Sequence, residues 1–385
     1  MSTFKNKIIV RINYLHMRHF LIAFALFAGF YAAAQTNPDD RSKLINHLQN
    51  IDTSKLFSPE AQNKYNEGVA AFEARKNDEA IAKFSEAITL EPKFIKAYNN
   101  RASIYFEMKK YDEAIADFKK ITELTDTVPN AWFMLGQVND AKGDLAAAIE
   151  SYTKALEKKP KAESFYNRGV DYFQTSEYDK AIADFDKAIG MKSDYAYAYN
   201  DRGSAKKMKG DLPGAAADYS RAVLMNPKLT FAYNNLGSVY REQKKYQEAI
   251  AEYNNALRFK PDYYIAINNK GMAEFDAVRY EDAIKTFTEC IKQKADYAYA
   301  YNNRAAAYIK LQKYKEAIAD CDKAISLYPE YGAAYLNRGI AREMIRDLEG
   351  ACADWLQGAS YGIESSERYY NSNVCEEVQK YKEQH

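Results

Sequence analysis

Histidine is almost absent from this sequence of 385 residues. The four histidines are His16, His19, His47 and His385. The body of the chain between Glu60 and Gln384 therefore lacks the commonest general base and the commonest transition-metal ligand. A GxxxxGK loop, a GxGxxG turn and a GxSxG elbow are missing as well. We therefore expect a protein that is not an enzyme and that has no cofactor and no metal.

An excess of positive charge is also lacking. Lys and Arg total 54, Asp and Glu total 53, and the net charge is +1. A surface that binds nucleic acid needs clustered excess Lys and Arg, so this balance argues against a nucleic-acid partner. Hydrophobic residues make up 47% of the chain, which argues against disorder.

Residues 1–34 have the pattern of a signal peptide. Four basic residues precede the apolar run of residues 20–34: Lys5, Lys7, Arg11 and Arg18. The run is shorter than the roughly 20 residues of a membrane span, and it ends in three alanines before Gln35, as cleavage sites do. We expect cleavage after Ala34, an exported protein that is periplasmic or secreted, and no membrane span once the signal is removed. An uncleaved anchor is the alternative, and residues 35–58 are predicted to be a tether.

A repeat of 34 residues dominates the rest of the chain. The segment YDEAI at Tyr111 recurs as YDKAI at Tyr178, YQEAI at Tyr246, YEDAI at Tyr280 and YKEAI at Tyr314. Aligning these segments defines nine repeats within residues 59–361, which begin at residues 61, 95, 129, 162, 196, 230, 264, 298 and 332. Every step is 34 residues except one of 33. Self-similarity at this period indicates a stacked array.

Fixed positions of the repeat carry fixed kinds of residue. Position 8 is Gly or Ala, position 20 is always Ala, and position 24 is aromatic except at Cys321. Small residues let two antiparallel helices approach closely, and large residues fill the space beside the contact. Proline stands at position 32 in five repeats, where it ends the second helix. The pattern predicts one helical hairpin per repeat.

This pattern resembles the tetratricopeptide family over residues 59–361. The resemblance implies an all-α fold, a right-handed α-solenoid of nine antiparallel helix pairs whose first helices line a concave groove. Lys64 departs from the family at a large apolar position, and four residues stand where proline is expected: Asp126, Ser193, Ala295 and Ile363. These departures leave only the local turn geometry open.

Residues 362–385 are predicted to be a C-terminal helical cap. Their apolar face comprises Tyr369, Tyr370, Val374, Val378 and Tyr381. Such a cap would cover the otherwise open face of the last repeat.

Asparagine recurs at position 6 of the first helix. The seven asparagines are Asn66, Asn100, Asn167, Asn235, Asn269, Asn303 and Asn337, and the two exceptions are Met134 and Asp201. Each carboxamide offers one acceptor and two donors, enough to hold both polar groups of a peptide unit. The column is similar to the asparagine ladder of O-linked N-acetylglucosamine transferases, which implies binding of an extended peptide. A role in helix packing is the alternative.

An apolar lane accompanies the column at position 2 of repeats five to eight. It comprises Tyr197, Phe231, Ile265 and Tyr299. These residues are candidates to receive side chains of a bound peptide, and packing against the preceding repeat is the alternative.

The function that these features favour is a non-catalytic scaffold for a protein or peptide partner. The alternative is a carbohydrate or cell-wall-glycan binder that uses groove aromatics. About half of the 33 tyrosines fall at packing positions, which favours the first interpretation. The Lys at position 5 and Asn at position 9 with which chaperone-binding arrays hold a C-terminal carboxylate are missing, which argues against a heat-shock cochaperone.

The four cysteines all lie after residue 289. Cys352 lies in the last repeat and Cys375 in the predicted cap, so a disulfide between them would tie the cap to the array, as an exported chain permits. The stretch GACADW at Gly350 resembles the terminal repeat of exported bacterial tetratricopeptide proteins. Cys290 and Cys321 replace core residues and are predicted to be buried thiols.

Overall fold

The computed structural model describes residues 58–125 and 129–384. Within these residues every regular element is a helix, α3 to α22. The predicted signal peptide and nearly all of the tether lie outside the described residues, as does Asp126. The chain divides into two compact units, which are treated separately: α3–α12 within Ala33–Met225, and α13–α22 within Asn226–His385.

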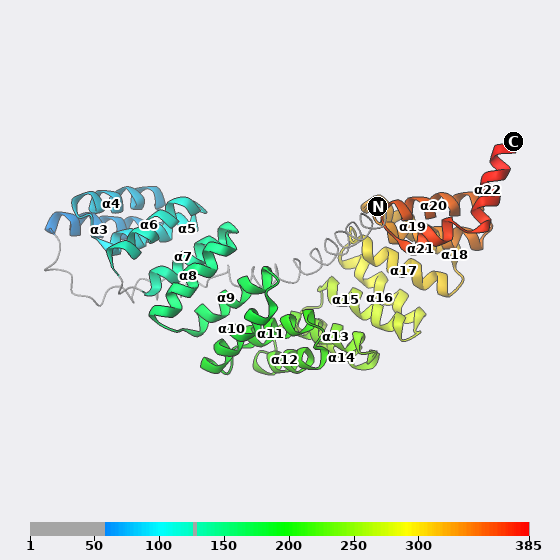
Figure 1. Cartoon of the computed structure of the whole chain (residues 1–385), viewed down its shortest axis with the longest axis horizontal. Helices are drawn as coiled ribbons and strands as arrows, with labels where there is room; N and C mark the ends of the chain where they lie inside the picture. Colours follow the sequence, from blue (N-terminus) through cyan, green and yellow to red (C-terminus); the bar gives the residue numbers. More distant parts are fainter. Residues whose placement is uncertain (1–57, 126–128, 385) are drawn as a thin grey trace, which may run out of the picture. The chain divides into compact units, whose positions relative to one another are not determined.

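The α3–α12 unit consists of five helical hairpins (Figure 1). Its helices are α3 (Pro59–Glu73), α4 (Asn77–Leu90), α5 (Ile95–Glu107), α6 (Tyr111–Leu124), α7 (Pro129–Lys142), α8 (Leu145–Lys158), α9 (Ala162–Gln174), α10 (Tyr178–Met191), α11 (Ala196–Met208) and α12 (Leu212–Met225). Each odd-numbered helix is the first helix of a repeat, and the helix after it is the second.

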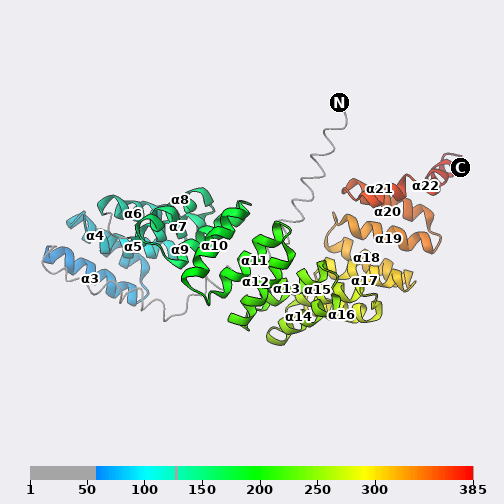
Figure 2. The ribbon, with the colours of Figure 1, turned by 60° about the horizontal axis from the view of Figure 1, so that its bottom comes forward.

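The α13–α22 unit adds four hairpins and two further helices (Figure 2). Its helices are α13 (Thr230–Glu242), α14 (Tyr246–Phe259), α15 (Tyr264–Asp276), α16 (Tyr280–Gln293), α17 (Ala298–Lys310), α18 (Tyr314–Leu327), α19 (Gly332–Met344), α20 (Leu348–Ser360), α21 (Glu364–Tyr370) and α22 (Asn373–Gln384). The two units together hold nine helix pairs, which confirms the predicted all-α architecture in the described residues.

Small residues at position 8 lie against the ring at position 24 of the same hairpin. A Cβ atom added to Gly136 would lie 2.6 Å from the ring of Tyr152, and one added to Gly271 would lie 2.6 Å from the ring of Phe287. The alanine at position 20 is fully buried in all nine repeats. Close approach of the two helices at small residues is the packing that the sequence predicts.

The turn inside each hairpin holds one residue in the left-handed backbone region. Position 15 has a positive φ in every repeat, and it is glycine only at Gly143 and Gly210. The other seven residues there have φ between 59° and 70°. The next residue closes the turn, as where the N–H of Lys110 donates to the carbonyl of Tyr105 at 2.8 Å. No glycine signature marks these turns in the sequence.

The turn between repeats keeps its form where proline is missing. Beside Pro261, the N–H of Tyr263 donates to the carbonyl of Lys260 at 3.1 Å. The equivalent bonds measure 3.1 and 3.2 Å where Ser193 and Ala295 replace proline. Because this turn position tolerates most residues, the departures from the family pattern leave the array intact at both places.

The helices α21 and α22 pack against the last hairpin. Tyr370 and Val378 contact the buried cluster around Trp355, and the ring of Tyr369 stacks on Trp355 with centroids 4.8 Å apart. Tyr381, at the far end of α22, is 65% exposed. The cap therefore uses only part of its predicted apolar face.

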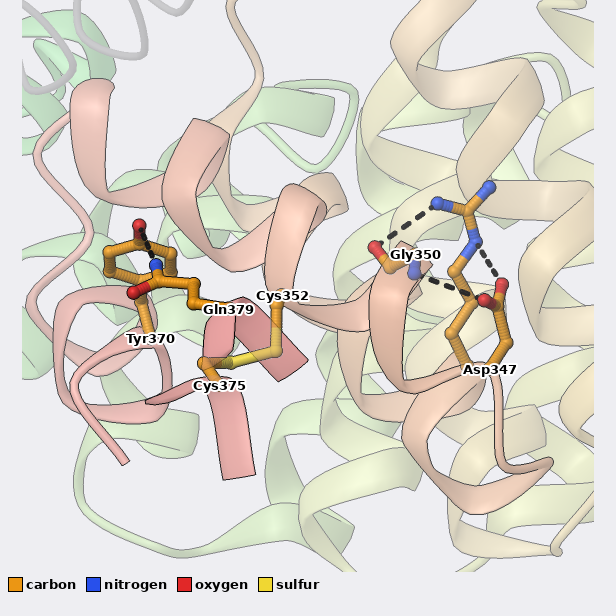
Figure 3. The surroundings of a disulfide bond; sticks show 7 residues. Asp347, Gly350, Cys352, Tyr370, Cys375 and Gln379 are labelled. Atoms are coloured by element: carbon orange, nitrogen blue, oxygen red, sulfur yellow. Dashed lines mark hydrogen bonds and ion pairs between the residues drawn. A yellow bond between two sulfur atoms is a disulfide. The ribbon is translucent and has the colours of Figure 1, made fainter. Parts of the chain in front are cut away.

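A disulfide joins this cap to the last repeat. Cys352 of α20 and Cys375 of α22 are bonded, with Cα atoms 5.6 Å apart (Figure 3). Beside it, the amide of Gln379 donates to the hydroxyl of Tyr370 at 2.7 Å. The other two cysteines, Cys290 and Cys321, are free and buried. Burial raises the pKa of both thiols, that of Cys290 to about 12, so neither is a reactive thiolate at neutral pH.

Candidate functional site

The candidate site is the surface formed by positions 2, 6, 9 and 13 of the first helices, which we term the first-helix face. These positions share one stripe, because residues three or four apart in a helix lie on one face. The seven asparagines at position 6 form two columns, one in each unit: Asn66, Asn100 and Asn167 in the first, and Asn235, Asn269, Asn303 and Asn337 in the second. Asn66 is exposed, and the other six are half-buried.

In the α13–α22 unit the column is hydrogen-bonded sideways from repeat to repeat. The side-chain amides donate at 2.9–3.0 Å to asparagines at position 5 of the preceding repeat: Asn269 to Asn234, Asn303 to Asn268, and Asn337 to Asn302. The accepting asparagines are buried, with 5–6% exposure. Each bridge satisfies a buried carbonyl oxygen and ties two repeats together. A structural role therefore accompanies any role in binding.

In the α3–α12 unit, other side chains form hydrogen bonds across the same sequence separation of 35 residues. The amide of Asn100 donates to the hydroxyl of Tyr65 at 3.1 Å, and the hydroxyl of Tyr166 donates to the carboxylate of Asp201 at 2.7 Å. Burial raises the pKa of Asp201 to about 6, against the opposing effect of the hydrogen bonds that Tyr166 and Asn200 donate to its carboxylate. Asn167 departs from the pattern, because its amide donates to Tyr152 at 3.4 Å.

The residues at position 2 are half-buried rather than free on the surface. The ring of Tyr299 lies between those of Tyr297 and Tyr331, with centroid distances of 5.3 and 5.1 Å. Ile265 packs against the cluster that contains Tyr263. Tyr197, Phe231, Ile265 and Tyr299 all keep part of their surface exposed. The lane is thus built into the junctions between repeats, as the packing alternative expects, and still borders the asparagine column.

Position 9 is also engaged in packing. The hydroxyls of Ser204 and Tyr219 are hydrogen-bonded at 3.0 Å, and those of Ser238 and Tyr253 at 3.3 Å. These short side chains hold the position-24 tyrosines by their polar ends.

A second polar network, which the sequence analysis missed, joins the hairpins through arginine. In five repeats an Arg at position 7 makes a bidentate pair with an Asp at position 23: Arg101–Asp117, Arg168–Asp184, Arg202–Asp218, Arg304–Asp320 and Arg338–Asp354. The same guanidinium reaches position 25 of the preceding repeat, where Ser85, Thr153, Asp186, Thr288 or Asp322 accepts. We term this three-residue unit the arginine clasp.

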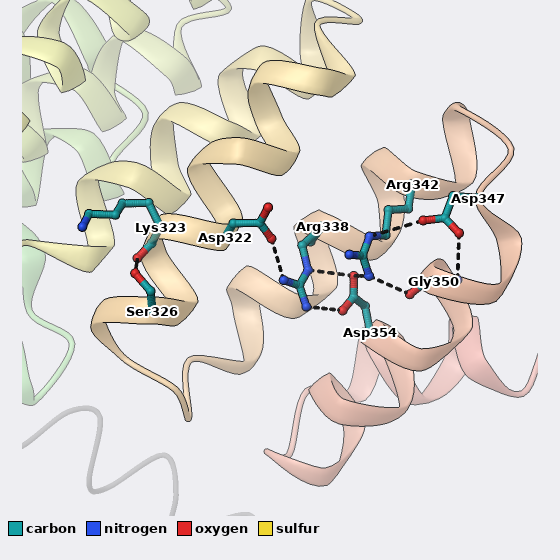
Figure 4. A network of polar contacts seen from close by, with 8 residues as sticks. All are labelled: Asp322, Lys323, Ser326, Arg338, Arg342, Asp347, Gly350 and Asp354. Carbon is teal, nitrogen blue, oxygen red and sulfur yellow. Dashed lines mark hydrogen bonds and ion pairs between the residues drawn. The ribbon is translucent and has the colours of Figure 1, made fainter.

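Figure 4 shows the clasp at the last repeat. Arg338 lies between Asp354 of its own hairpin and Asp322 of the preceding one, at 2.6 Å from each. Arg342 adds a contact of 2.9 Å to Asp354. The Asp354 carboxylate is therefore held by two cations, and this cluster belongs to the framework rather than to the first-helix face.

The sequence contained a signal for the clasp. The repeats that lack Arg at position 7 also lack Asp at position 23, and in the first repeat the two charges are exchanged as Glu67 and Lys83, 3.0 Å apart. Co-occurrence within one repeat indicates a contact between its two helices. A comparison within one repeat does not identify the acceptor at position 25, because that residue lies in the preceding repeat.

The described residues contain neither a metal-binding cluster nor a helix suited to cross a membrane. No group of three or more His, Cys, Asp or Glu side chains that could hold a metal ion occurs in the described part of the chain. Over the same residues, no helix combines the length and apolar character that crossing a membrane requires.

Comparison with known proteins identifies the repeat. Family models described as Tetratricopeptide repeat match residues 95–124, 129–162, 162–195, 230–263 and 298–331. Hsp70-Hsp90 organizing protein 3 of Arabidopsis thaliana is 28% identical over 133 residues, which cover 34% of this chain. The matched part spans only 24% of that relative's length.

Two crystal structures share the fold. A tetratricopeptide repeat protein from Parabacteroides merdae aligns with a TM-score of 0.53 and 20% identity, covering 63% of this chain and 97% of that one. The C-terminal part of a repeat-containing protein from Cytophaga hutchinsonii aligns with a TM-score of 0.53 and 19% identity, covering 62% and 98%. With the fixed positions 8, 20 and 24 in their predicted places, these matches agree that the chain carries tetratricopeptide repeats and that its described part is an all-helical array of them.

Proposed function

We propose that this chain is a non-catalytic scaffold whose first-helix face binds an extended peptide segment of a partner protein. Tetratricopeptide repeats mediate interactions between proteins, which supports the general class. The plant relative is named for Hsp70 and Hsp90, and one feature of this chain argues against these partners. The Lys and Asn clamp at positions 5 and 9 is missing from all nine repeats.

The observation that carries the proposal is the fixed orientation of three carboxamides at regular pitch. The bridges of Asn269, Asn303 and Asn337 each use one amide N–H. A carboxamide has two such donors and an acceptor oxygen, so one N–H and the carbonyl oxygen of each are left for a ligand. A peptide backbone presents that pair of groups at every residue. Because the bridges orient the amides beforehand, binding costs little additional ordering.

The tyrosines give less support to glycan binding. Tyr152, Tyr219 and Tyr253 at position 24 are buried, with at most 2% exposure. The position-17 rings of Tyr178 and Tyr280 pack edge-on against phenylalanines at 5.5 and 5.2 Å. Rings used in this way are not platforms for sugars, so glycan binding remains the second candidate.

We further propose that the chain is exported to the periplasm or secreted. The proposal rests on the signal-peptide pattern of residues 1–34, and the disulfide between Cys352 and Cys375 supports it because oxidising compartments preserve such bonds. N-terminal sequencing of protein from the native host should begin at Gln35. Full-length protein in the cytosol would contradict export.

The binding proposal is tested by replacing three rungs of the column. The wild-type chain is used to capture partners, and peptide arrays of the captured protein define the bound segment. Asn235→Ala, Asn269→Ala and Asn303→Ala together remove three hydrogen bonds worth about 0.5–1.5 kcal/mol each. We expect affinity for that peptide to fall by about a hundredfold. Titration calorimetry measures this change.

A matched variant separates binding from packing. Asn234→Ala with Asn268→Ala breaks two of the same bridges but keeps the rungs. We expect it to lower the melting temperature, as the triple variant does, while reducing affinity far less. Asn254→Ala, an exposed asparagine on α14, should change neither quantity. Equal loss of affinity in the double and triple variants would make the column structural, and unchanged affinity in the triple variant would reject the proposed site.

A further inference from the structure

Two carboxyl groups lie in the interface between the third and fourth repeats, and one of them replaces a residue that is apolar in every other repeat. Asp140 stands at position 12 of α7 and Asp171 at position 10 of α9. In the other eight repeats position 10 is apolar: Ala70, Ile104, Val138, Ala205, Val239, Ala273, Ala307 and Ala341. Between the last two repeats, Ile309 at position 12 and Ala341 at position 10 belong to one apolar cluster. The third and fourth repeats replace such a contact with two acids.

Asp171 is buried more deeply than an ionisable carboxyl group usually is. The residue is 1% exposed, and neither carboxyl oxygen has a hydrogen-bond donor among the described residues. No Lys or Arg of the described chain forms an ion pair with Asp140 or Asp171. A carboxylate buried without a donor or a cation is costly, and such groups stay neutral instead.

The surroundings of the pair offer no compensating charge. Burial raises the pKa of Asp171, and the charge of Asp140 raises it further. Burial also raises the pKa of Asp140. The other titratable group that faces the pair is Tyr152 of α8, whose own pKa is raised by burial and by both carboxylates. No charged group of α10 or α11, which pack against α9, contributes to the raised pKa of either acid. The two acids titrate as one coupled unit.

We propose that Asp140 and Asp171 form a proton-binding pair that closes the interface between the third and fourth repeats and loosens it when the proton leaves. A proton on one carboxyl lets it donate a hydrogen bond to the other. Loss of that proton leaves two carboxylates that repel each other in a medium that screens them poorly. The proposal concerns the framework, and it does not depend on the proposed peptide site.

The direction of the pH effect follows from the raised pKa values. An aspartate in the unfolded chain has a pKa of about 3.9. Above that pH the folded chain still binds a proton that the unfolded chain has released. The contribution of the pair to the free energy of unfolding is therefore complete below about pH 4, and it is lost as the pH rises through the raised pKa values.

Two variants of the full chain test the pair. Asp171→Asn keeps a hydrogen-bond donor toward Asp140 and leaves one titrating carboxyl group in place of the pair. Asp140→Ile with Asp171→Ala imitates the apolar pair Ile309 and Ala341. Thermal unfolding is followed from pH 5 to pH 8, and hydrogen exchange of α7 and α9 is compared with that of α4 in the same molecule after correction for intrinsic rates. Asp201, whose pKa is about 6, titrates in all three proteins, so only the difference between them reports on the pair.

We expect the wild type to lose more thermal stability over this pH range than either variant. The pKa of an aspartate in the open state, about 3.9, lies below the tested pH range. We therefore also expect local opening of α7 and α9 to rise about tenfold for each pH unit between pH 5 and the raised pKa of the pair. Parallel pH profiles in wild type and both variants would reject the pair. Restoration of the wild type at pH 8 by millimolar Ca²⁺, without such an effect in Asp171→Asn, would show a cation site and overturn the proton assignment. If Asp171→Asn fails to fold, the apolar double variant decides alone.

Discussion

Val278 shows most clearly the conflict between a side chain and its backbone. It occupies position 15 with a φ of 63°, and it is 68% exposed. A β-branched residue rarely adopts positive φ, because its branched Cβ crowds the neighbouring carbonyl. Such strain costs about 1–3 kcal/mol. The exposed side chain gains little from packing that would offset this cost.

We expect Val278→Gly to stabilise the α13–α22 unit by about 1 kcal/mol. Glycine removes the strained Cβ, and the gain exceeds the extra flexibility that it gives the unfolded chain. Denaturant unfolding of the full chain measures the change. Gly143→Val, at the equivalent turn of the third repeat with φ 89°, is the reverse experiment and should destabilise. A destabilising Val278→Gly would show that the turn does not strain its side chain.

Single residues also mark what the sequence could and could not predict. The residues at positions 8, 20 and 24 were predictable, because their sizes recur and have one physical explanation. Position 15 was not, because five different residue types other than glycine serve there. The asparagines at position 6 were found as a column, but their bridges to position 5 were not. That partner lies in the preceding repeat, 35 residues away, where helical spacing gives no indication of contact.

At the scale of helices, the arginine clasp fixes both the two helices of a hairpin and the junction before it. The Arg304 side chain is 16% exposed and that of Asp320 is 10% exposed, so the pair is largely removed from water. A bidentate arginine–carboxylate pair is directional, and this sets the register of the helices that carry it.

Replacing the aspartate of one arginine clasp tests how much the clasp contributes to the free energy of unfolding. We expect Asp320→Ala to destabilise the α13–α22 unit by about 3 kcal/mol, because Arg304 is left largely buried without its partner. The double variant Arg304→Leu with Asp320→Ser carries the residues that the third repeat has at these two positions. It should recover most of the lost stability. The exposed pair Lys120–Glu123 is the control, and Lys120→Ala should cost about 0.5 kcal/mol or less. Denaturant unfolding measures the loss of stability in each variant. Equal losses in Asp320→Ala and Lys120→Ala would contradict the idea that burial makes the clasp more important than an exposed ion pair.

At the scale of the whole chain, each hairpin depends mainly on its immediate neighbours. The side-chain hydrogen bonds between repeats described above all join adjacent repeats. The apolar clusters likewise extend from one repeat to the next through the junctions between them. Stability of a stacked array is then a sum of local and nearest-neighbour contributions. The nine-pair array was predictable from periodicity alone. The division into two units was not, since the repeat pattern continues across residues 225 and 226.

Overpacking one hairpin should therefore have a local effect. Ala249 is fully buried at position 20 of the sixth repeat. We expect Ala249→Leu to cost about 1–3 kcal/mol and to raise hydrogen exchange locally, around residues 230–295. Glu248→Leu, at the exposed neighbouring position, is the control and should leave exchange unchanged. A rise that extends through α3–α12 would contradict nearest-neighbour coupling.

The acceptor of the arginine clasp also bears on how such a chain can grow. Position 25 is Ser, Thr or Asp in the five clasps, and each of these side chains offers an oxygen at the same place. Any repeat that carries Arg at position 7 can thus follow any repeat that carries one of these three residues. Duplication or loss of a 34-residue unit in the gene would create a junction that is already compatible. The repeats are exchangeable at their borders, so the length of the array can change in single steps while its ends keep their own sequences.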